Sequence, residues 1–279
     1  MIRSRFTLPS WLYNSRLADQ LSEHWQRLLL AVSFMTRLPV PQQLDYSSQR
    51  MHQALVYFPL VGWLLALLLV AVFCAVNVLF GSSVAVVLTM IASLLMTGAL
   101  HEDGLADCFD GFYGGFERQS KLEIMKDSRI GTYGSCALIL ALALKLVALI
   151  SLAEAGTGMV VLAILVAYPF SRALAITHAQ DLSYVSAPGK SKSDPLARPL
   201  SRRQLLTMVS LGAISLILLP WQAAALVFAA GIGLRWLLKR WMDKHIAGFT
   251  GDALGAAQQL QELVVYLMLL ATLQQGWLA

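Results

Sequence analysis

Long apolar stretches alternate with polar ones along most of the chain. Pro220 divides one apolar run, 204–238, that is too long for a single crossing. A helix needs about 20 apolar residues to cross a bilayer core. The apolar stretches that approach or reach this length cover residues 54–80, 84–100, 135–153, 159–177, 205–219, 223–238 and 263–278. The pattern predicts an all-α, polytopic integral membrane protein with about seven transmembrane helices.

The stretch before the first predicted span has a different character. Apolar side chains recur at helical spacing within residues 19–38, with polar residues between them, at Leu21, Trp25, Leu28, Val32 and Met35. This spacing is typical of an amphipathic helix that lies on a membrane surface. Pro39 ends the pattern, because proline cannot continue a helix. We therefore expect an N-terminal amphipathic helix ahead of the spans.

Composition and charge agree with a membrane protein. The chain is 57% hydrophobic and 13% charged, whereas soluble domains carry about 25% charged residues. The net charge of +5 would suit a nucleic-acid partner. However, the basic residues fall in every second connection between the predicted spans, and these connections all lie on one side of the membrane. The positive-inside rule explains this alternation. We therefore expect lipid and no nucleic acid as a partner, with the N-terminus and the three polar segments in the cytoplasm.

One polar segment is unusually acidic. Directly after the second apolar run, within residues 101–111, lie Glu102, Asp103, Asp107 and Asp110. If the segment is helical, the three aspartates are spaced i, i+4 and i+7 along one face. Such carboxylates repel one another unless a cation lies between them, and hard divalent cations prefer oxygen ligands. The alternative is a set of solvated acids just past a helix end.

A glycine-rich turn follows within residues 126–134. If it opens a helix, the backbone N–H groups near Gly131 and Gly134 can bind a phosphate. Arg129 could add a bidentate contact to the same oxygens. The alternative is a helix C-cap followed by an ordinary loop.

Isolated polar residues elsewhere have two interpretations each. Thr250 or Asp252 could cap a helix, or Asp252 could complete a metal shell. Glu262 lies at the mouth of the last span and requires a partner, which is an interfacial lysine, the metal or a bound hydroxyl. Lys145 and Arg172 lie inside predicted spans, where charge is costly, so each either forms an ion pair or contacts substrate.

Together these residues resemble the cobalamin 5'-phosphate synthase family (adenosylcobinamide-GDP ribazoletransferase). The resemblance covers roughly residues 25–279, which we expect to form a single membrane-embedded catalytic domain after a variable extension, 1–24. The matching pieces are 36–41, 58–59 with Gly62, Gly98, 101–107, 110–111, 123–134, Lys145, Arg172, 250–252, 255–256 and Glu262. Position 102 is often leucine in this family, so Glu102 departs from the common pattern.

The resemblance implies a reaction and a cofactor. Adenosylcobinamide-GDP and α-ribazole, or its 5'-phosphate, would give adenosylcobalamin or its phosphate, with release of GMP and use of Mg²⁺. Asp103, Asp107 and Asp110 would be catalytic and hold Mg²⁺, with Glu102, Asp252 and Glu262 as further metal ligands. The substrate-binding residues would be Arg37, Asp127, Arg129, Gly131, Gly134, Lys145, Arg172 and Thr250. Partners beyond substrate would be a second copy of the chain or other enzymes of the same pathway.

Two alternatives remain open at this stage. CDP-alcohol phosphotransferases also place several aspartates and an Asp-Gly pair at a membrane face, although here Ala106 is followed by Asp107 rather than by arginine. An anion transporter would use Lys145 and Arg172 for its permeant ion. The transporter alternative leaves the carboxylate cluster unexplained.

Overall fold

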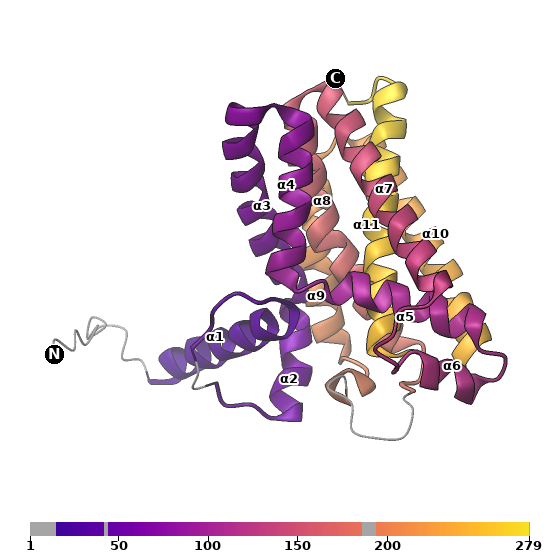
Figure 1. Ribbon diagram of the computed structural model, residues 1–279. Helices are drawn as coiled ribbons and strands as arrows, with labels where there is room; N and C mark the ends of the chain where they lie inside the picture. The colour runs from indigo at the N-terminus through magenta and orange to yellow at the C-terminus, as the bar shows by residue number, and fades with distance from the viewer. Residues whose placement is uncertain (1–14, 42–43, 186–193, 279) are drawn as a thin grey trace, which may run out of the picture.

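The computed structural model describes residues 15–41, 44–185 and 194–278 (Figure 1). The first part of the predicted extension, 1–14, lies outside this range. The α-helices are α1 Ser15–Met35, α2 Ser48–Ala54, α3 Phe58–Phe80, α4 Ser82–Thr97, α5 Leu100–Gly114, α6 Arg118–Ile124, α7 Thr132–Ala155, α8 Thr157–Ile176, α9 Arg202–Ala213, α10 Trp221–Ile246 and α11 Gly251–Gln274. Short 3-10 segments are η2 Leu55–Tyr57, η3 Thr177–Gln180, η4 Asp194–Ala197 and η5 Ile214–Leu218.

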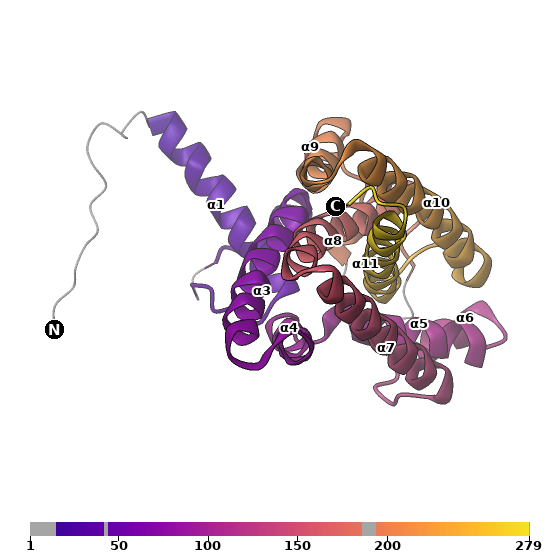
Figure 2. The same ribbon diagram turned by 90° about the horizontal axis from the view of Figure 1, so that it is seen from above.

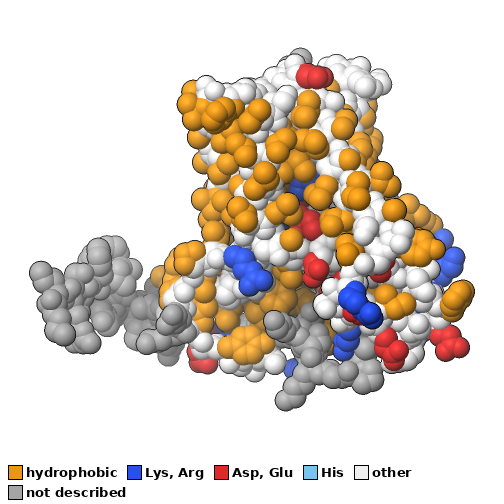
Figure 3. All heavy atoms as spheres, viewed as in Figure 1, with side chains coloured by type: hydrophobic (Ala, Val, Ile, Leu, Met, Phe, Trp, Pro, Cys, Tyr) orange, Lys and Arg blue, Asp and Glu red, His pale blue; other side chains and the backbone are white. Residues whose placement is uncertain are grey.

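The long helices form a bundle with two helices at its centre. Seen from above, α8 and α11 lie inside a ring made by α3, α4, α7, α9 and α10 (Figure 2). Most side chains of α8 and α11 are buried, whereas most of those on α3, α7 and α10 are not. The exposed side chains of the outer helices are largely apolar, and they cover the upper part of the molecule (Figure 3). An apolar surface of this extent suits lipid rather than water, so the chain is a multi-pass membrane protein.

The number of spans differs from the prediction. Five helical stretches among the described residues are long and apolar enough to cross a membrane, or six if α4 and α5, bent by 85°, count as one. The predicted count of seven is not confirmed. The predicted hairpin over 205–238 accounts for part of the difference, because α9 covers only 12 residues and gives way to a 3-10 segment. α10 then runs for 26 residues as one helix.

The last helix begins well before the predicted span at 263–278. α11 starts at Gly251, where the Thr250 side chain accepts a hydrogen bond from the Ala253 N–H at 3.1 Å. Hydropathy excluded the first half of α11 because it contains Gln258, Gln259, Gln261 and Glu262. All four side chains are buried and hydrogen-bonded inside the bundle. Their polar groups bond to protein, so they do not mark a helix end.

A sharp bend places α5 across the lower end of the bundle (Figure 1). Gly98 and Ala99 both have left-handed backbone conformations, with φ of 64° and 56°, and they end α4. The acidic segment is therefore helical, and it meets α11 closely at Gly104. A Cβ atom at Gly104 would lie 2.6 Å from the carbonyl oxygen of Asp252. At the other end of α5, the Phe112 ring stacks on His245 of α10 with 4.8 Å between centroids.

The contact between α3 and α8 supplies a stability test. A Cβ atom at Gly62 would lie 2.7 Å from the backbone of Tyr168 and Pro169. We expect Gly62→Ala to force these helices apart and to lower the free energy of unfolding by about 1–3 kcal/mol. Thermal unfolding in detergent measures the effect. Gly158→Ala is the control, because its Cβ would meet nothing within 4 Å, and an equal loss in both variants would contradict the packing argument.

Candidate active site

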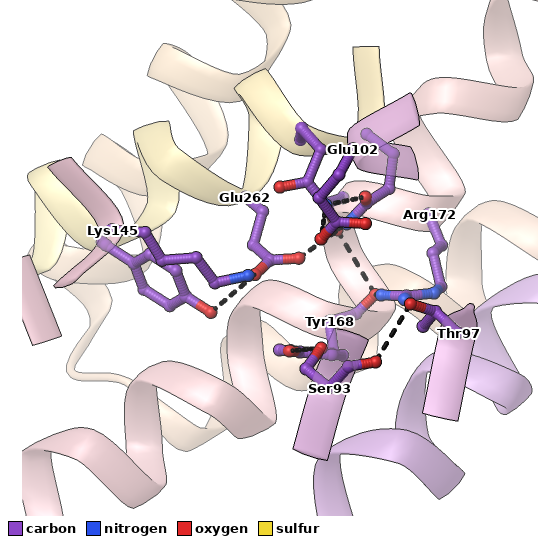
Figure 4. A network of polar contacts seen from close by, with 11 residues as sticks. Ser93, Thr97, Glu102, Lys145, Tyr168, Arg172 and Glu262 are labelled. Atoms are coloured by element: carbon purple, nitrogen blue, oxygen red, sulfur yellow. Dashed lines mark hydrogen bonds and ion pairs between the residues drawn. The ribbon is translucent and has the colours of Figure 1, made fainter. Parts of the chain in front are cut away.

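A buried ion pair joins α7 to α11. Lys145 Nζ lies against Glu262 Oε1, and the two side chains are only 5% and 2% exposed (Figure 4). The Tyr266 hydroxyl donates to Glu262 at 3.0 Å, and Gln258 Nε2 donates to it at 2.7 Å. The structure thus gives Glu262 the lysine partner that was one of its two predicted roles. Lys145 likewise takes the ion-pair role.

Arg172 and Glu102 extend this network to α8 and α5. Arg172 is 2% exposed, donates from Nη1 to the Tyr168 carbonyl at 2.9 Å, and lies over the Tyr168 ring with 4.9 Å to its centroid. Glu102 accepts from Gln259 Nε2 at 3.1 Å. Within the described chain, Glu102 Oε2 and Arg172 Nε have no hydrogen-bond partner. Such buried polar atoms are uncommon and call for an explanation. Glu102 therefore faces the bundle interior, away from the aspartates.

The network also contains residues that the sequence interpretation missed. These residues form hydrogen bonds of 2.6–3.1 Å within the network, and they are Ser93, Tyr168, Ser171, Gln258, Gln259 and Tyr266. The glutamines carried a usable signal, because polar side chains at adjacent turns of an apolar helix must find partners inside the protein. Tyr168 carried none, since a tyrosine in a span is common.

On the outer side of the same crossing, α5 and α11 bring aspartates together. Asp103 is exposed, and Asp107 and Asp252 are half-buried. Burial raises the pKa of the Asp107 carboxyl to about 8, and the neighbouring charges of Asp252, Asp103 and Asp110 add to this effect. The prediction placed Asp252 near the aspartate stripe, and the close approach at Gly104 brings it there. These carboxylates form a site with excess negative charge.

Asp110 has a different environment from the other aspartates. Its two carboxylate oxygens accept hydrogen bonds from the backbone N–H groups of Gly131 at 2.6 Å and Gly134 at 2.8 Å. It therefore caps α7 and occupies the amides predicted to bind phosphate. Both positions require glycine. A Cβ atom at Gly131 would lie 2.5 Å from Asp110 Oδ1, and a Cβ atom at Gly134 would lie even closer to Asp110 Oδ2.

The remaining predicted substrate residues are dispersed. Arg129 is 87% exposed and pairs with Asp127 at 2.5 Å; its hydrogen bonds hold the pKa of the Asp127 carboxyl below its usual value. Arg37 lies against Gly98 at the bend between α4 and α5, and its N–H donates to the Met96 carbonyl at 2.7 Å. Thr250 caps α11.

No preformed metal cage exists among the described residues. Within residues 15–41, 44–185 and 194–278, no three His, Cys, Asp or Glu side chains lie close enough together to enclose an ion. Mg²⁺ often binds through one or two carboxylates, with substrate phosphates and water completing its shell. The open set Asp103, Asp107 and Asp252 fits that kind of site.

A mostly apolar pocket adjoins the carboxylates on the inner side of α11. It is lined by Phe34, Met35, Phe58, Leu100, His101, Arg172, Ala175, Ile176, Leu196, Gly251, Asp252, Leu254, Gly255 and Gln258. Its walls come from α1, α3, α5, α8, η4 and α11. Asp252 thus borders both the pocket and the aspartate cluster.

Comparison with known proteins decides between the alternatives. The family model described as cobalamin-5-phosphate synthase matches residues 27–270. The chain belongs to the cobalamin-5-phosphate synthase family. This confirms the resemblance and excludes the CDP-alcohol phosphotransferase and anion-transporter alternatives, because the matching family and relatives are transferases of cobalamin synthesis.

Several proteins similar to this chain share one name. A protein of Pseudoalteromonas atlantica called adenosylcobinamide-GDP ribazoletransferase is 52% identical over 254 residues, which is 91% of this chain and 94% of that protein. Proteins of the same name from Vibrio cholerae and Shewanella amazonensis are each 48% identical, over 92% and 89% of this chain and 98% and 96% of their own lengths. No solved structure gives a significant match.

The buried Lys145–Glu262 pair predicts that removing one charge destabilises the protein more than removing both. Glu262→Gln would leave Lys145 charged and unpaired inside the bundle, at a cost of about 3–5 kcal/mol. The double variant Lys145→Met with Glu262→Gln removes both charges and should recover most of the loss. Thermal unfolding in detergent compares the three proteins. Equal stability of the single and double variants would contradict the pairing.

Proposed function

We propose that the chain catalyses the reaction for which its relatives are named, at the face where α5 crosses α11. The family membership gives the substrates, adenosylcobinamide-GDP and α-ribazole or its 5'-phosphate. The observation that carries the location is the close contact of Gly104 with Asp252. This contact adds a third carboxylate to Asp103 and Asp107 at an accessible edge of the bundle.

Asp103, Asp107 and Asp252 would hold Mg²⁺ there. Two features support its presence: the oxygen donors grouped at one edge of the bundle, and an open arrangement that a pyrophosphate can complete. Burial and the neighbouring acids raise the pKa of Asp107, and a bound cation would offset the repulsion among these acids. When bound, the ion neutralises the negative charge that spreads over the phosphate oxygens during transfer. Glu102, Glu262 and Asp110 have protein partners instead and serve the scaffold in this arrangement.

The reaction requires one bond to form and one to break at phosphorus. A ribose hydroxyl oxygen of the ribazole attacks the cobinamide-side phosphorus of the pyrophosphate. The bond from that phosphorus to the bridging oxygen breaks, and GMP leaves with the electron pair. The hydroxyl proton passes to a carboxylate of the cluster. Lys126, which lies within electrostatic range of Asp252, adds positive charge on the side from which an anionic substrate approaches.

The orientation follows from charge. Lysines and arginines gather at the end of the bundle that carries α5 and α6, whereas the opposite turns contain none (Figure 3). By the positive-inside rule, this end would face the cytoplasm, with the bundle in a bacterial inner membrane. A second copy of the chain, or another enzyme of the pathway, stays a predicted partner.

The metal assignment has a direct test. In purified protein with both substrates, we expect EDTA to abolish cobalamin formation and Mg²⁺ to restore it. Asp103→Asn and Asp107→Asn each remove one ligand charge, so the Mg²⁺ concentration for half-maximal rate should rise at least about tenfold.

Glu117→Gln is the matched control, because Glu117 is an exposed acid at the same end of the bundle that makes no capping hydrogen bond. It should retain the wild-type Mg²⁺ dependence. Aspartate variants that turn over at the wild-type rate in limiting Mg²⁺ would exclude this cluster as the metal site.

A further inference from the structure

The pocket beside the carboxylates has the walls of a binding site for a flat apolar group. Phe34 of α1 and Phe58 of α3 stack with 5.7 Å between ring centroids at one side. Leu254 of α11 and Ile176 of α8 also line the space, and both are buried. Six separate elements contribute, so the pocket is shaped by the tertiary fold and does not arise within one helix.

One residue that lines the pocket carries an unsatisfied donor. Arg172 lines it and is 2% exposed, yet its Nε has no hydrogen-bond partner among the described residues. A buried donor without a partner costs about 1–3 kcal/mol. An occupant that brings an acceptor would recover this cost. The site therefore favours a molecule that combines apolar area with a hydrogen-bond acceptor.

The position of Asp252 links the pocket to the reaction. Asp252 lies at the pocket edge and is also a charged neighbour of Asp103 and Asp107. The part of a bound molecule nearest Asp252 would thus point towards the proposed pyrophosphate position. This is the arrangement that an acceptor hydroxyl needs, because the attacking oxygen must lie close to phosphorus in line with the leaving group.

We propose that this pocket, between α1, α3, α5, α8 and α11, binds the benzimidazole base of the ribazole acceptor. Phe34, Phe58 and Leu254 would contact the ring faces and edges. Arg172 Nε would donate to the base's unsubstituted ring nitrogen, and the ribose would point its hydroxyl at Asp252. The inference rests on the proposed function and adds which substrate occupies which part of the site.

Other occupants fit the pocket less well. A corrinoid carries many amide groups, which the mostly apolar lining of the pocket does not match. A guanine base has more polar edge groups than His101, Arg172, Asp252 and Gln258 can satisfy in one plane. A lipid acyl chain suits the apolar wall but offers no acceptor to Arg172.

Phe58→Leu tests the proposal, with Phe73→Leu as its matched control. Both phenylalanines lie on α3 and are buried, at 3% and 0% exposure, but only Phe58 lines the pocket. Loss of ring contact in Phe58→Leu should raise KM for α-ribazole about tenfold. KM for adenosylcobinamide-GDP should stay within twofold. Phe73→Leu should leave both KM values unchanged.

A binding measurement separates recognition from turnover. Calorimetric titration of purified protein with α-ribazole in EDTA should show binding to the wild type and to Phe73→Leu, with about tenfold weaker binding to Phe58→Leu. If Phe58→Leu does not fold, Phe34→Leu on α1 provides the same test from the facing ring.

Three outcomes would overturn the assignment: an unchanged KM for α-ribazole in Phe58→Leu, as expected for a lipid-filled pocket; a raised KM for adenosylcobinamide-GDP; or equal effects in the two variants. Failure of the proposed function is distinguishable from these. In that case the wild-type protein with Mg²⁺ and both substrates would release no GMP at all.

Discussion

The cost of placing charge inside an apolar bundle constrains this structure more than any other factor. Lys145 and Glu262 are both buried and lie in direct contact, and either charge alone would be strongly unfavourable there. The pair fixes the facing sides of α7 and α11, and the hydrogen bonds from Gln258 and Tyr266 fix the orientation of the carboxylate. Arg172 and Glu102 add one basic and one acidic side chain to this network (Figure 4).

The network and the proposed reaction site share two helices. On α5, Glu102 points into the bundle, whereas its neighbour Asp103 is exposed. On α11, Glu262 lies in the interior, whereas Asp252 stands in the first turn at the edge. The buried acids hold the two helices in place, and the outer acids meet because the helices cross at Gly104. The same crossing therefore supports a stable core and a concentration of negative charge at the surface.

The sequence predicted much of this arrangement, with errors that have physical causes. The length of the apolar runs predicted the spans at 135–153 and 159–177, and the structure confirms them as helices α7 and α8. Hydropathy placed the start of α11 too late, because it assumes that Gln258 and Glu262 face water. The predicted division at Pro220 is present, because α9 and η5 end before it and α10 begins after it. Apolar content did not reveal that α9 ends after 12 residues, too short to count as a span. The density and spacing of acids in 101–111 singled out the aspartates. The pocket depends on residues from six elements, and no local spacing connects them.

Asp110 has a structural role that the other aspartates of α5 do not share. Its spacing from Asp103 and Asp107 predicted a common role, yet its carboxylate bonds to the amides of Gly131 and Gly134 at the start of α7. These amides would suit a phosphate equally well, and two anionic groups cannot occupy them together. While Asp110 caps α7, these amides are not available to a phosphate. The two glycines meet a structural need: they let α5 approach α7 closely enough for the cap to form, and this contact fixes the two helices against each other.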